Sequence, residues 1–317
     1  MRLVFLMDPI EHVLVDKDTT FALMLSAQAR GHEVFTLSPR DLYSARGTAM
    51  ARVCRATVAR AERPRHATLG APEVVDLADV DAVFIRTDPP FDSQYLYATQ
   101  LLELVKRKTL VLNDPRGLRD ANEKLYALHF QAVMPRTVVT AKEADVRAFL
   151  EELGGPGVIK PLDGAGGRGI MVLDLADKNF RSIIETLTDD GRRYAMVQEF
   201  LPAVRVGDKR ILLLDGEPLG AILRVPRADE ARSNIHVGGS VVPATLDADD
   251  QAIVAAVRPR LKADGLYFVG LDVIGGRLTE VNVTSPTGIQ ELSRFTASDP
   301  EGKVIAWVEA KVAQMTE

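Results

Sequence analysis

The sequence predicts an α/β protein that begins with a parallel sheet and continues into two smaller α+β units. Strand and helix patterns alternate along the first 122 residues, and this order builds a parallel sheet with helices on both faces. A glycine-rich segment at 164–169 then separates two strand patterns, and two later strand pairs flank the turns at 215–216 and 275–276. We therefore expect three units, covering residues 1–122, 123–200 and 201–317.

Composition narrows the class of protein before any motif is considered. The 317 residues are 46% hydrophobic and 26% charged, which is ordinary for a globular protein and excludes intrinsic disorder. The net charge of -5 argues against non-specific nucleic-acid binding, for which a basic face is usual. No stretch approaches the ~18 apolar residues of a membrane span, and the first apolar run stops at Asp8, too early for a signal peptide. The single cysteine, Cys54, fits a reducing compartment, so we expect a cytoplasmic protein.

In the first unit, short apolar runs predict strands and helix-spaced apolar residues predict helices. Asp18 is suited to cap the first helix, and Gly31 is suited to end it. Because ligands of parallel sheets bind beyond the carboxyl ends of the strands, the polar loops at 8–9 and 86–92 mark the expected binding edge. The predicted strands are 3–7, 33–37, 82–85 and 109–112, and the predicted helices are 18–30 and 93–106.

The second and third units are expected to be α+β. Thr140 and Glu143 fit a capping box that would open a helix reaching residue 153. In the third unit, Asp215-Gly216 is a typical hairpin turn. The remaining predicted strands are 137–139, 158–160, 170–173, 195–198, 210–214, 218–224, 267–274 and 278–283, and the remaining helices are 180–187, 247–264 and 303–313.

Residues 164–169 fit the pattern G-x-G-x-x-G, which in dinucleotide-binding folds places a pyrophosphate on a helix N-terminus. Here residues 170–173 are apolar and strand-like, which disfavours that interpretation. A flexible surface hairpin is the simplest alternative. We favour a loop between antiparallel strands that closes over phosphates with its backbone N–H groups, because Lys160 precedes the loop and suits a phosphate contact.

A magnesium site is predicted around the turn at 275–276. Glu280 and Asn282 are two residues apart in a strand and therefore share one face. A two-residue turn would pair Glu280 with Leu271, whereas a three-residue turn or an equivalent bulge would bring Asp272 opposite Glu280. Three oxygen ligands on a rigid hairpin suit Mg²⁺, although a solvated polar face is the alternative. Zinc is disfavoured, because the five histidines show no ligand spacing and the cysteine is alone.

Cationic side chains and a polar loop complete the candidate site. Lys209 and Arg210 open an apolar strand, and Arg224 closes its hairpin partner. Such cations can hold an anionic substrate or a transferring phosphoryl group, and strand-end charges in solvent are the alternative. Residues 228–239, which include Arg232, fit either a mobile lid or an ordinary loop. The arginine-rich stretch 52–65 fits a solvated face or subunit contact better than an RNA-binding patch.

Six blocks of sequence, spread over nearly the whole chain, are more specific than any single glycine motif. They are residues 7–10 (MDPI), 86–92 (RTDPPFD), 118–124 (LRDANEK), 160–164 (KPLDG), 207–210 (GDKR) and 280–287 (EVNVTSPT). In these blocks the chain resembles the bacterial-type glutathione synthetases of the ATP-grasp superfamily. It departs from the family pattern at 233–237 and after Thr287, and these departures bear on acceptor specificity.

The resemblance implies a Rossmann-like N-terminal sheet, ATP sandwiched between the central and C-terminal units, Mg²⁺ or Mn²⁺ as the metal, and a homotetramer. The implied ATP-binding residues are Lys124, Lys160, Gly164, Gly166, Gly167, Gln198, Glu199, Phe200, Leu201 and Asp208. The implied metal ligands are Asp272, Glu280 and Asn282. Stabilisation of the reacting acyl phosphate falls to Arg210, Arg232 and Gly239, and binding of the peptide and glycine to Arg86, Arg224, Ser285 and Thr287.

The implied activity is ligation of γ-glutamylcysteine and glycine to glutathione, with ADP and phosphate released by way of an acyl phosphate. No covalent enzyme nucleophile is needed, and the sequence has no G-x-S-x-G elbow. Two other functions stay open at this level. One is another ATP-grasp ligase that joins a different amine to a carboxylate, such as a protein-glutamylating ligase, and the other is a catalytically silent nucleotide-binding regulator.

Overall fold

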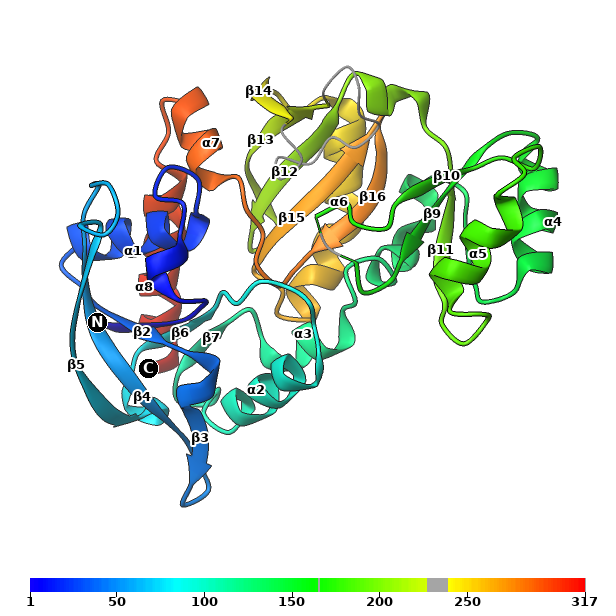
Figure 1. Ribbon diagram of the computed structural model, residues 1–317. Helices are drawn as coiled ribbons and strands as arrows, with labels where there is room; N and C mark the ends of the chain where they lie inside the picture. The colour runs from blue at the N-terminus through cyan, green and yellow to red at the C-terminus, as the bar shows by residue number, and fades with distance from the viewer. Residues whose placement is uncertain (165, 227–238, 317) are drawn as a thin grey trace.

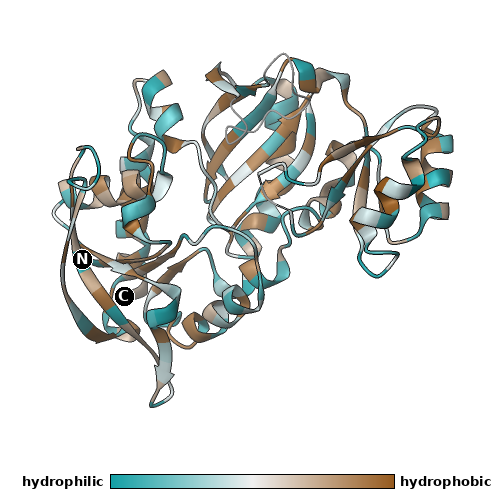
Figure 2. Cartoon of the chain, viewed as in Figure 1, coloured by the Kyte–Doolittle hydropathy of each residue, from teal (hydrophilic) through white to brown (hydrophobic). Residues whose placement is uncertain are grey.

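The computed structural model describes residues 1–164, 166–226 and 239–316. It contains three β-sheets, and the sheet of the third unit lies between the first and second units (Figure 1). Apolar residues gather on the strands, while the outward sides of helices such as α4 (Glu143–Leu153) are hydrophilic (Figure 2). Among the described residues, no helix combines the length and the apolar character needed to cross a membrane.

The first sheet contains the predicted parallel arrangement, because four consecutive strands, in the order β2-β1-β6-β7, pair in parallel. Leu3 and Phe5 pack toward α1 (Thr19–Ala29), whereas Val4 and Leu6 pack toward α2 (Ser93–Glu103), following the two-residue period of a strand. The four strands are β1 (Arg2–Leu6), β2 (Glu33–Leu37), β6 (Ala82–Ile85) and β7 (Leu110–Leu112).

Three antiparallel strands at the edge of this sheet were not predicted. They are β3 (Leu42–Ala45), β4 (Thr48–Val58) and β5 (Ala67–Asp76). Part of the arginine-rich stretch lies on β4, where exposed arginines alternate with buried apolar residues. Arg52 pairs with Asp41 and Arg55 with Glu33, each at 3.2 Å. On β4 the stretch is therefore the solvated face of a half-buried strand.

The central sheet is antiparallel, with strand order β10-β9-β11-β8, and is covered by α4 and α5 (Phe180–Thr188) on the side away from the third unit (Figure 1). The predicted capping box is wrong: Thr140 Oγ1 donates instead to Asp145 Oδ2 at 2.6 Å, and Lys142 is the N-cap residue of α4. The strands are β8 (Thr137–Thr140), β9 (Gly157–Pro161), β10 (Met171–Leu173) and β11 (Ala195–Glu199).

The third sheet is also antiparallel, with strand order β14-β13-β12-β15-β16, and α6 (Ala248–Ala263) packs on one face. Its first hairpin has the predicted two-residue turn: Leu214 lies opposite Glu217, and Asp215 and Gly216 have φ values of 49° and 76°. The strands are β12 (Asp208–Leu214), β13 (Glu217–Val225), β14 (Ser240–Ala244), β15 (Phe268–Ile274) and β16 (Arg277–Asn282).

The end of the chain returns to the first sheet. After α7 (Ile289–Phe295), helix α8 (Pro300–Thr316) packs beside α1, and its Val304, Ile305 and Val308 share one apolar cluster with Leu3. The last helix of the predicted third unit thus completes the core of the first.

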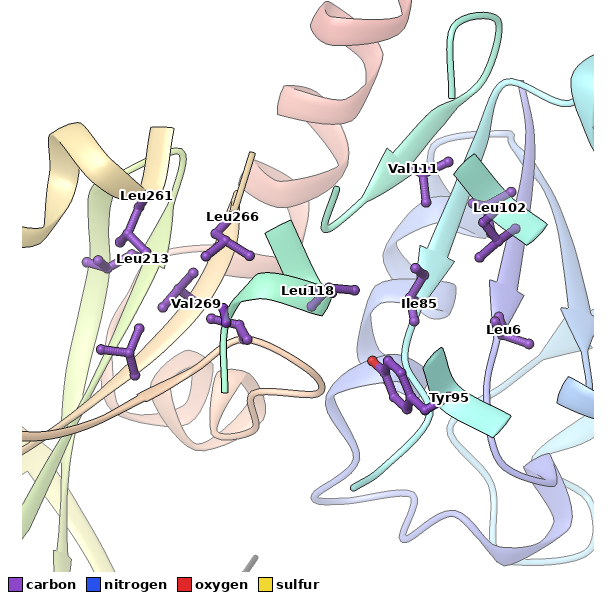
Figure 3. Packing of buried hydrophobic residues seen from close by; sticks show 14 of the residues in the cluster. Leu6, Ile85, Tyr95, Leu102, Val111, Leu118, Leu213, Leu261, Leu266 and Val269 are labelled. Carbon is purple, nitrogen blue, oxygen red and sulfur yellow. The ribbon is translucent and has the colours of Figure 1, made fainter. Parts of the chain in front are cut away.

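A continuous core joins the first and third units. Leu118, on α3 (Pro115–Asp120), lies between Ile85 and Val111 on one side and Leu266 and Val269 on the other (Figure 3). The described 3-10 helices are Ile10–His12, Pro39–Asp41, Leu77–Asp79, Tyr126–Val133 and Pro202–Arg205. This packing fixes the third sheet, which carries most of the candidate site, against the first.

Candidate active site

The glycine-rich segment joins two antiparallel strands, with Met171 opposite Ile159. A strand and not a helix follows the loop, so the dinucleotide-fold interpretation is excluded. Gly166 and Gly167 have φ values of 64° and 77°, a backbone conformation that favours glycine. The segment therefore has the strand–loop–strand form that we expected of a phosphate loop.

Lys124 connects this loop to the third sheet. Its Nζ donates to the carbonyl oxygen of Gly164 at 2.6 Å and lies 3.0 Å from Glu280 Oε1. The Lys124 side chain is buried, and its backbone N–H donates to Asn122 Oδ1 at 3.1 Å. A buried cation thus stands between the glycine loop and strand β16.

A second lysine lies on the central sheet. Lys160 on β9 and Gln198 on β11 share one face, because Gln198 lies opposite Val158 in the ladder. Lys160 Nζ donates to Gln198 Oε1 at 2.6 Å. Burial lowers the pKa of Lys160, and the nearby Glu280 carboxylate opposes that shift. The two lysines and Glu280 therefore belong to one electrostatic group.

The turn at 275–276 resolves the alternatives for Asp272. The turn has two residues, since Ile274 lies opposite Arg277, but Thr279 is bulged and Asp272 lies opposite Glu280. Thr279 Oγ1 donates to the carbonyl oxygen of Asp272 at 3.1 Å. The equivalent bulge, and not the three-residue turn, gives the predicted register.

The three side chains predicted to bind metal fit a hard cation by their chemistry. Asp272 and Glu280 supply carboxylate oxygens, and Asn282 supplies an amide oxygen. The Nδ2 of Asn282 donates to the carbonyl oxygen of Gly270 at 3.2 Å, which directs its Oδ1 away from that strand. Among the described residues, no three His, Cys, Asp or Glu side chains form a metal cluster, so the set needs the amide of Asn282.

Two arginines compensate the charge of Asp272. Arg210 Nε and Nη2 donate to its two carboxylate oxygens at 2.6 and 3.2 Å, and Arg224 Nη2 lies 2.9 Å from its Oδ1. Burial opposes ionisation, yet the charges of Arg210 and Arg224 lower the pKa of Asp272 to about 2.

Asp208 shares one of these arginines. Arg224 Nη2 donates to Asp208 Oδ2 at 2.5 Å. Burial raises the pKa of Asp208 to about 6; the charge of Arg224 opposes this shift and that of Asp272 adds to it. A network of fixed charges therefore runs across strands β13, β12 and β15.

Arg86 joins the first unit to the segment that follows β16. Its Nε donates to Thr20 Oγ1 and its Nη2 to the carbonyl oxygen of Pro286, both at 3.0 Å. Ser285 Oγ donates to the carbonyl oxygen of Arg86 at 3.4 Å. On the other side, Arg210 Nη1 donates to the carbonyl oxygen of Thr287 at 3.3 Å. Residues 285–287 are thus held between two arginines.

The remaining predicted site residues either take no part in the contacts above or lie outside the residues that the structure describes. Glu199, Phe200 and Leu201 are half-buried where β11 ends, and Gly239 is half-buried just before β14. Arg232 and residues 228–238 of the predicted lid lie outside the described residues. Lys209 forms ion pairs with Asp247 and Asp250 at the start of α6 and its side chain is largely covered, so it is not the solvated strand-end charge of the alternative.

Sequence reasoning missed two polar residues that connect the units, the buried Asn113 and the half-buried Glu123. Asn113 Nδ2 donates to the carbonyl oxygens of Phe268 and Val283, at 2.9 and 2.7 Å. Glu123 accepts hydrogen bonds from the segment after β16, and burial and the charge of Glu280 raise its pKa. The one available signal for Glu123 was its place directly before Lys124 in a block of the family pattern.

Comparison with known proteins agrees with this geometry. The model of the prokaryotic glutathione synthetase N-terminal domain matches residues 1–119, and that of the prokaryotic glutathione synthetase ATP-grasp domain matches residues 123–297. The chain belongs to the prokaryotic glutathione synthetase family. A glutathione synthetase from Synechocystis sp. is 48% identical over 319 residues, covering 98% of this chain and 99% of that protein. One from Salmonella typhimurium is 43% identical and covers 99% of this chain and all of that protein.

Solved structures show the fold of this family member. A D-cycloserine synthetase, DcsG, superposes with a TM-score of 0.67 at 17% identity, covering 99% of this chain and all of that one. An ATP-grasp ligase, PsnB, superposes with a TM-score of 0.63 at 19% identity, covering 98% and 97%. The predicted ATP-grasp fold is therefore confirmed.

Proposed function

We propose that this chain is an ADP-forming ligase that joins γ-glutamylcysteine to glycine and releases glutathione, ADP and phosphate. Full-length similarity to glutathione synthetases supports the choice of substrates. The observation that carries the proposal is the position of Lys124, which contacts both Gly164 of the glycine loop and Glu280 of the oxygen-donor strand. A phosphate loop and a metal-binding strand joined by a buried cation suit transfer of a phosphoryl group from ATP.

ATP is proposed to bind between the central and third sheets. Lys124 and Lys160 would contact its phosphates, together with the backbone of Gly164, Gly166 and Gly167. The segment 198–201 would lie against adenine, and Asp208 near the ribose. The name of the PsnB structure, a complex with minimal precursor, Mg and ADP, supports nucleotide and metal binding in this fold.

Mg²⁺, or Mn²⁺ in its place, is the proposed metal. Asp272, Glu280 and Asn282 would hold it, and when bound it would supply positive charge at the phosphates. The remaining charge comes from the chain itself: Arg210 and Arg224 are buried, fixed in position and directed at the same carboxylate. Such preorganised cations stabilise negative charge as it develops during the reaction.

The reaction requires no covalent bond to the protein. The cysteinyl carboxylate oxygen attacks the γ-phosphorus of ATP, and ADP leaves. The amine of glycine then attacks the carbonyl carbon of the acyl phosphate, loses a proton, and phosphate departs. Arg86, Arg224, Ser285 and Thr287 are proposed to position the two substrates, and Arg210, Arg232 and Gly239 to stabilise the acyl phosphate. Positioning and charge stabilisation supply most of the rate enhancement in such chemistry.

An acceptor panel tests the proposed function. With ATP, Mg²⁺ and γ-glutamylcysteine present, we expect ADP release to need glycine and glutathione to be the product. Turnover with a different amine or acyl donor would instead favour another ATP-grasp ligase, and no ADP from folded protein would favour a silent regulator. The homotetramer and the cytoplasmic location stay predictions, which sedimentation and cell fractionation can test.

A further inference from the structure

Glu123 forms hydrogen bonds with residues on both sides of Asn282, one of the proposed metal ligands. Its Oε1 accepts three hydrogen bonds, from the backbone N–H groups of Val283 and Thr284 at 3.0 and 3.1 Å and from Thr284 Oγ1 at 2.8 Å. Its backbone carbonyl oxygen accepts from the N–H of Val281 at 3.0 Å. One residue thus fixes the main chain before and after Asn282.

The same residue directly precedes Lys124, whose ammonium contacts Gly164 and Glu280. Any shift of β16 relative to Glu123 would therefore change the separation between the lysine and the donor strand. We propose that Glu123 is a positioning residue that holds the phosphate-contacting Lys124 in register with the Glu280 and Asn282 donors. This proposal rests on the proposed function in assigning nucleotide phosphates to Lys124 and the metal to Glu280 and Asn282.

The side-chain and main-chain contacts of Glu123 can be separated by mutation. Glu123→Ala removes the three bonds to Oε1 but keeps the main-chain bond from Val281. Glu123→Gln retains a carbonyl oxygen that can accept all three bonds. Thr284→Val removes only the hydroxyl donor. The three variants therefore form a series in which Glu123→Gln keeps the three hydrogen bonds, Thr284→Val loses one of them and Glu123→Ala loses all three.

A matched control exists far from the site. Asp76 Oδ1 also accepts from a backbone N–H, that of Ala78, and from a threonine hydroxyl, that of Thr48, both at 2.8 Å. Asp76 is the last residue of β5, at the edge of the first sheet. Asp76→Ala should therefore lower thermal stability without changing nucleotide affinity.

The test is calorimetric titration with ADP and Mg²⁺, which requires neither acyl donor nor acceptor and so survives a failure of the proposed ligase activity. We expect Glu123→Ala to raise the Kd of ADP by about tenfold or more, as loss of an outer contact to a metal site does. Glu123→Gln should raise it by less than about threefold, because the hydrogen bonds are retained. Thr284→Val should fall between them.

A Kd in Glu123→Ala equal to that of the wild type, with a melting temperature lowered as in Asp76→Ala, would overturn the proposal. If Glu123→Ala fails to fold, the decision passes to the other two variants. A wild-type Kd for ADP in Thr284→Val also overturns it. So does a Kd for ADP in Glu123→Gln that rises by about tenfold or more, the effect expected when all three hydrogen bonds to Oε1 are lost.

Discussion

Arg210 and Asp272 lie opposite each other on β12 and β15 and are joined by two hydrogen bonds between buried side chains. Arg224 adds a third contact to the same carboxylate. Removing one partner of a buried ion pair leaves an uncompensated charge and is costly. Asp272 therefore has two roles, as the counter-ion of two arginines and as a predicted metal ligand.

Asp272→Asn should lower ADP release by at least about 100-fold, because an amide is a weaker ligand for Mg²⁺ than a carboxylate. The melting temperature should fall, because Arg210 loses the only carboxylate partner that it has among the described residues, but the chain should remain folded, since Arg224 keeps its contact with Asp208. The measurement is ADP release under saturating substrates, with circular dichroism to verify folding. Asp250→Asn is the control, because Asp250 is a buried aspartate of the same unit that pairs with Lys209 instead. Near-normal activity of folded Asp272→Asn would refute the metal assignment.

Chelation should stop the reaction without unfolding the chain. Among the described residues, the carboxylate of Asp272 already pairs with Arg210 and Arg224, and that of Glu280 pairs with Lys124. The fold therefore does not depend on a metal to balance these charges. We expect EDTA to abolish ADP release, with the melting temperature of the nucleotide-free protein unchanged, and Mg²⁺ or Mn²⁺ to restore activity. Full turnover in excess EDTA would contradict a metal requirement.

Lys160→Gln should raise the KM for ATP by about tenfold or more, the equivalent of one lost charge-assisted contact to a phosphate. The fold should be retained, because the new amide can still hydrogen-bond to Gln198. The steady-state KM for ATP is the measurement, and Lys106→Gln, at an ion pair with Asp114 in the first unit, is the control. An unchanged KM for ATP in Lys160→Gln would remove Lys160 from the phosphate site.

The parts of the fold that were predicted are those whose patterns are set locally. The buried strand at 82–85 is a continuous apolar run, and a tight hairpin turn requires the positive φ values that Asp215-Gly216 adopts readily. The edge strand β4 does show a two-residue alternation, but its arginines were interpreted as part of a charged stretch, whereas β3 and β5 are mostly exposed and show no such alternation. Thr140 fits a capping box by sequence, but tertiary position turned its hydroxyl toward Asp145.

In the candidate site, too, local patterns could be predicted from the sequence and long-range contacts could not. We predicted that Asp272 would lie opposite Glu280 only with a three-residue turn or an equivalent bulge. The structure has a bulge at Thr279, which the residues of the turn do not indicate. The contacts of Lys124 and Glu123 join segments about 40 and 160 positions apart, so no local pattern could reveal their partners. Only the family resemblance singled out Lys124, and Glu123, which stands beside it in the same block, was assigned no role.

Helix α8 provides a test of pH dependence away from the site. Glu309 accepts hydrogen bonds from Arg30 at 2.9 and 2.5 Å and lies 2.7 Å from His32 Nε2. The hydrogen bonds from Arg30, followed by that from His32, lower the pKa of Glu309 from 4.5 to about 2. Because the folded-state pKa is the lower one, these contacts stabilise the chain fully above pH 4.5 and progressively less as the pH falls toward 2.

Glu309→Gln should therefore destabilise the chain at pH 7 by no more than about 1 kcal/mol, the usual range for a partly exposed ion pair. The difference from the wild type should shrink as the pH falls through the window from 4.5 to 2, and added salt should shrink it at pH 7. Urea unfolding across that pH range is the measurement. Glu301, a buried glutamate of the same helix that accepts from Ser293 Oγ, offers the comparison Glu301→Gln. A Glu309→Gln difference that stays constant with pH would show that the contacts of α8 with Arg30 and His32 do not depend on the charge of Glu309.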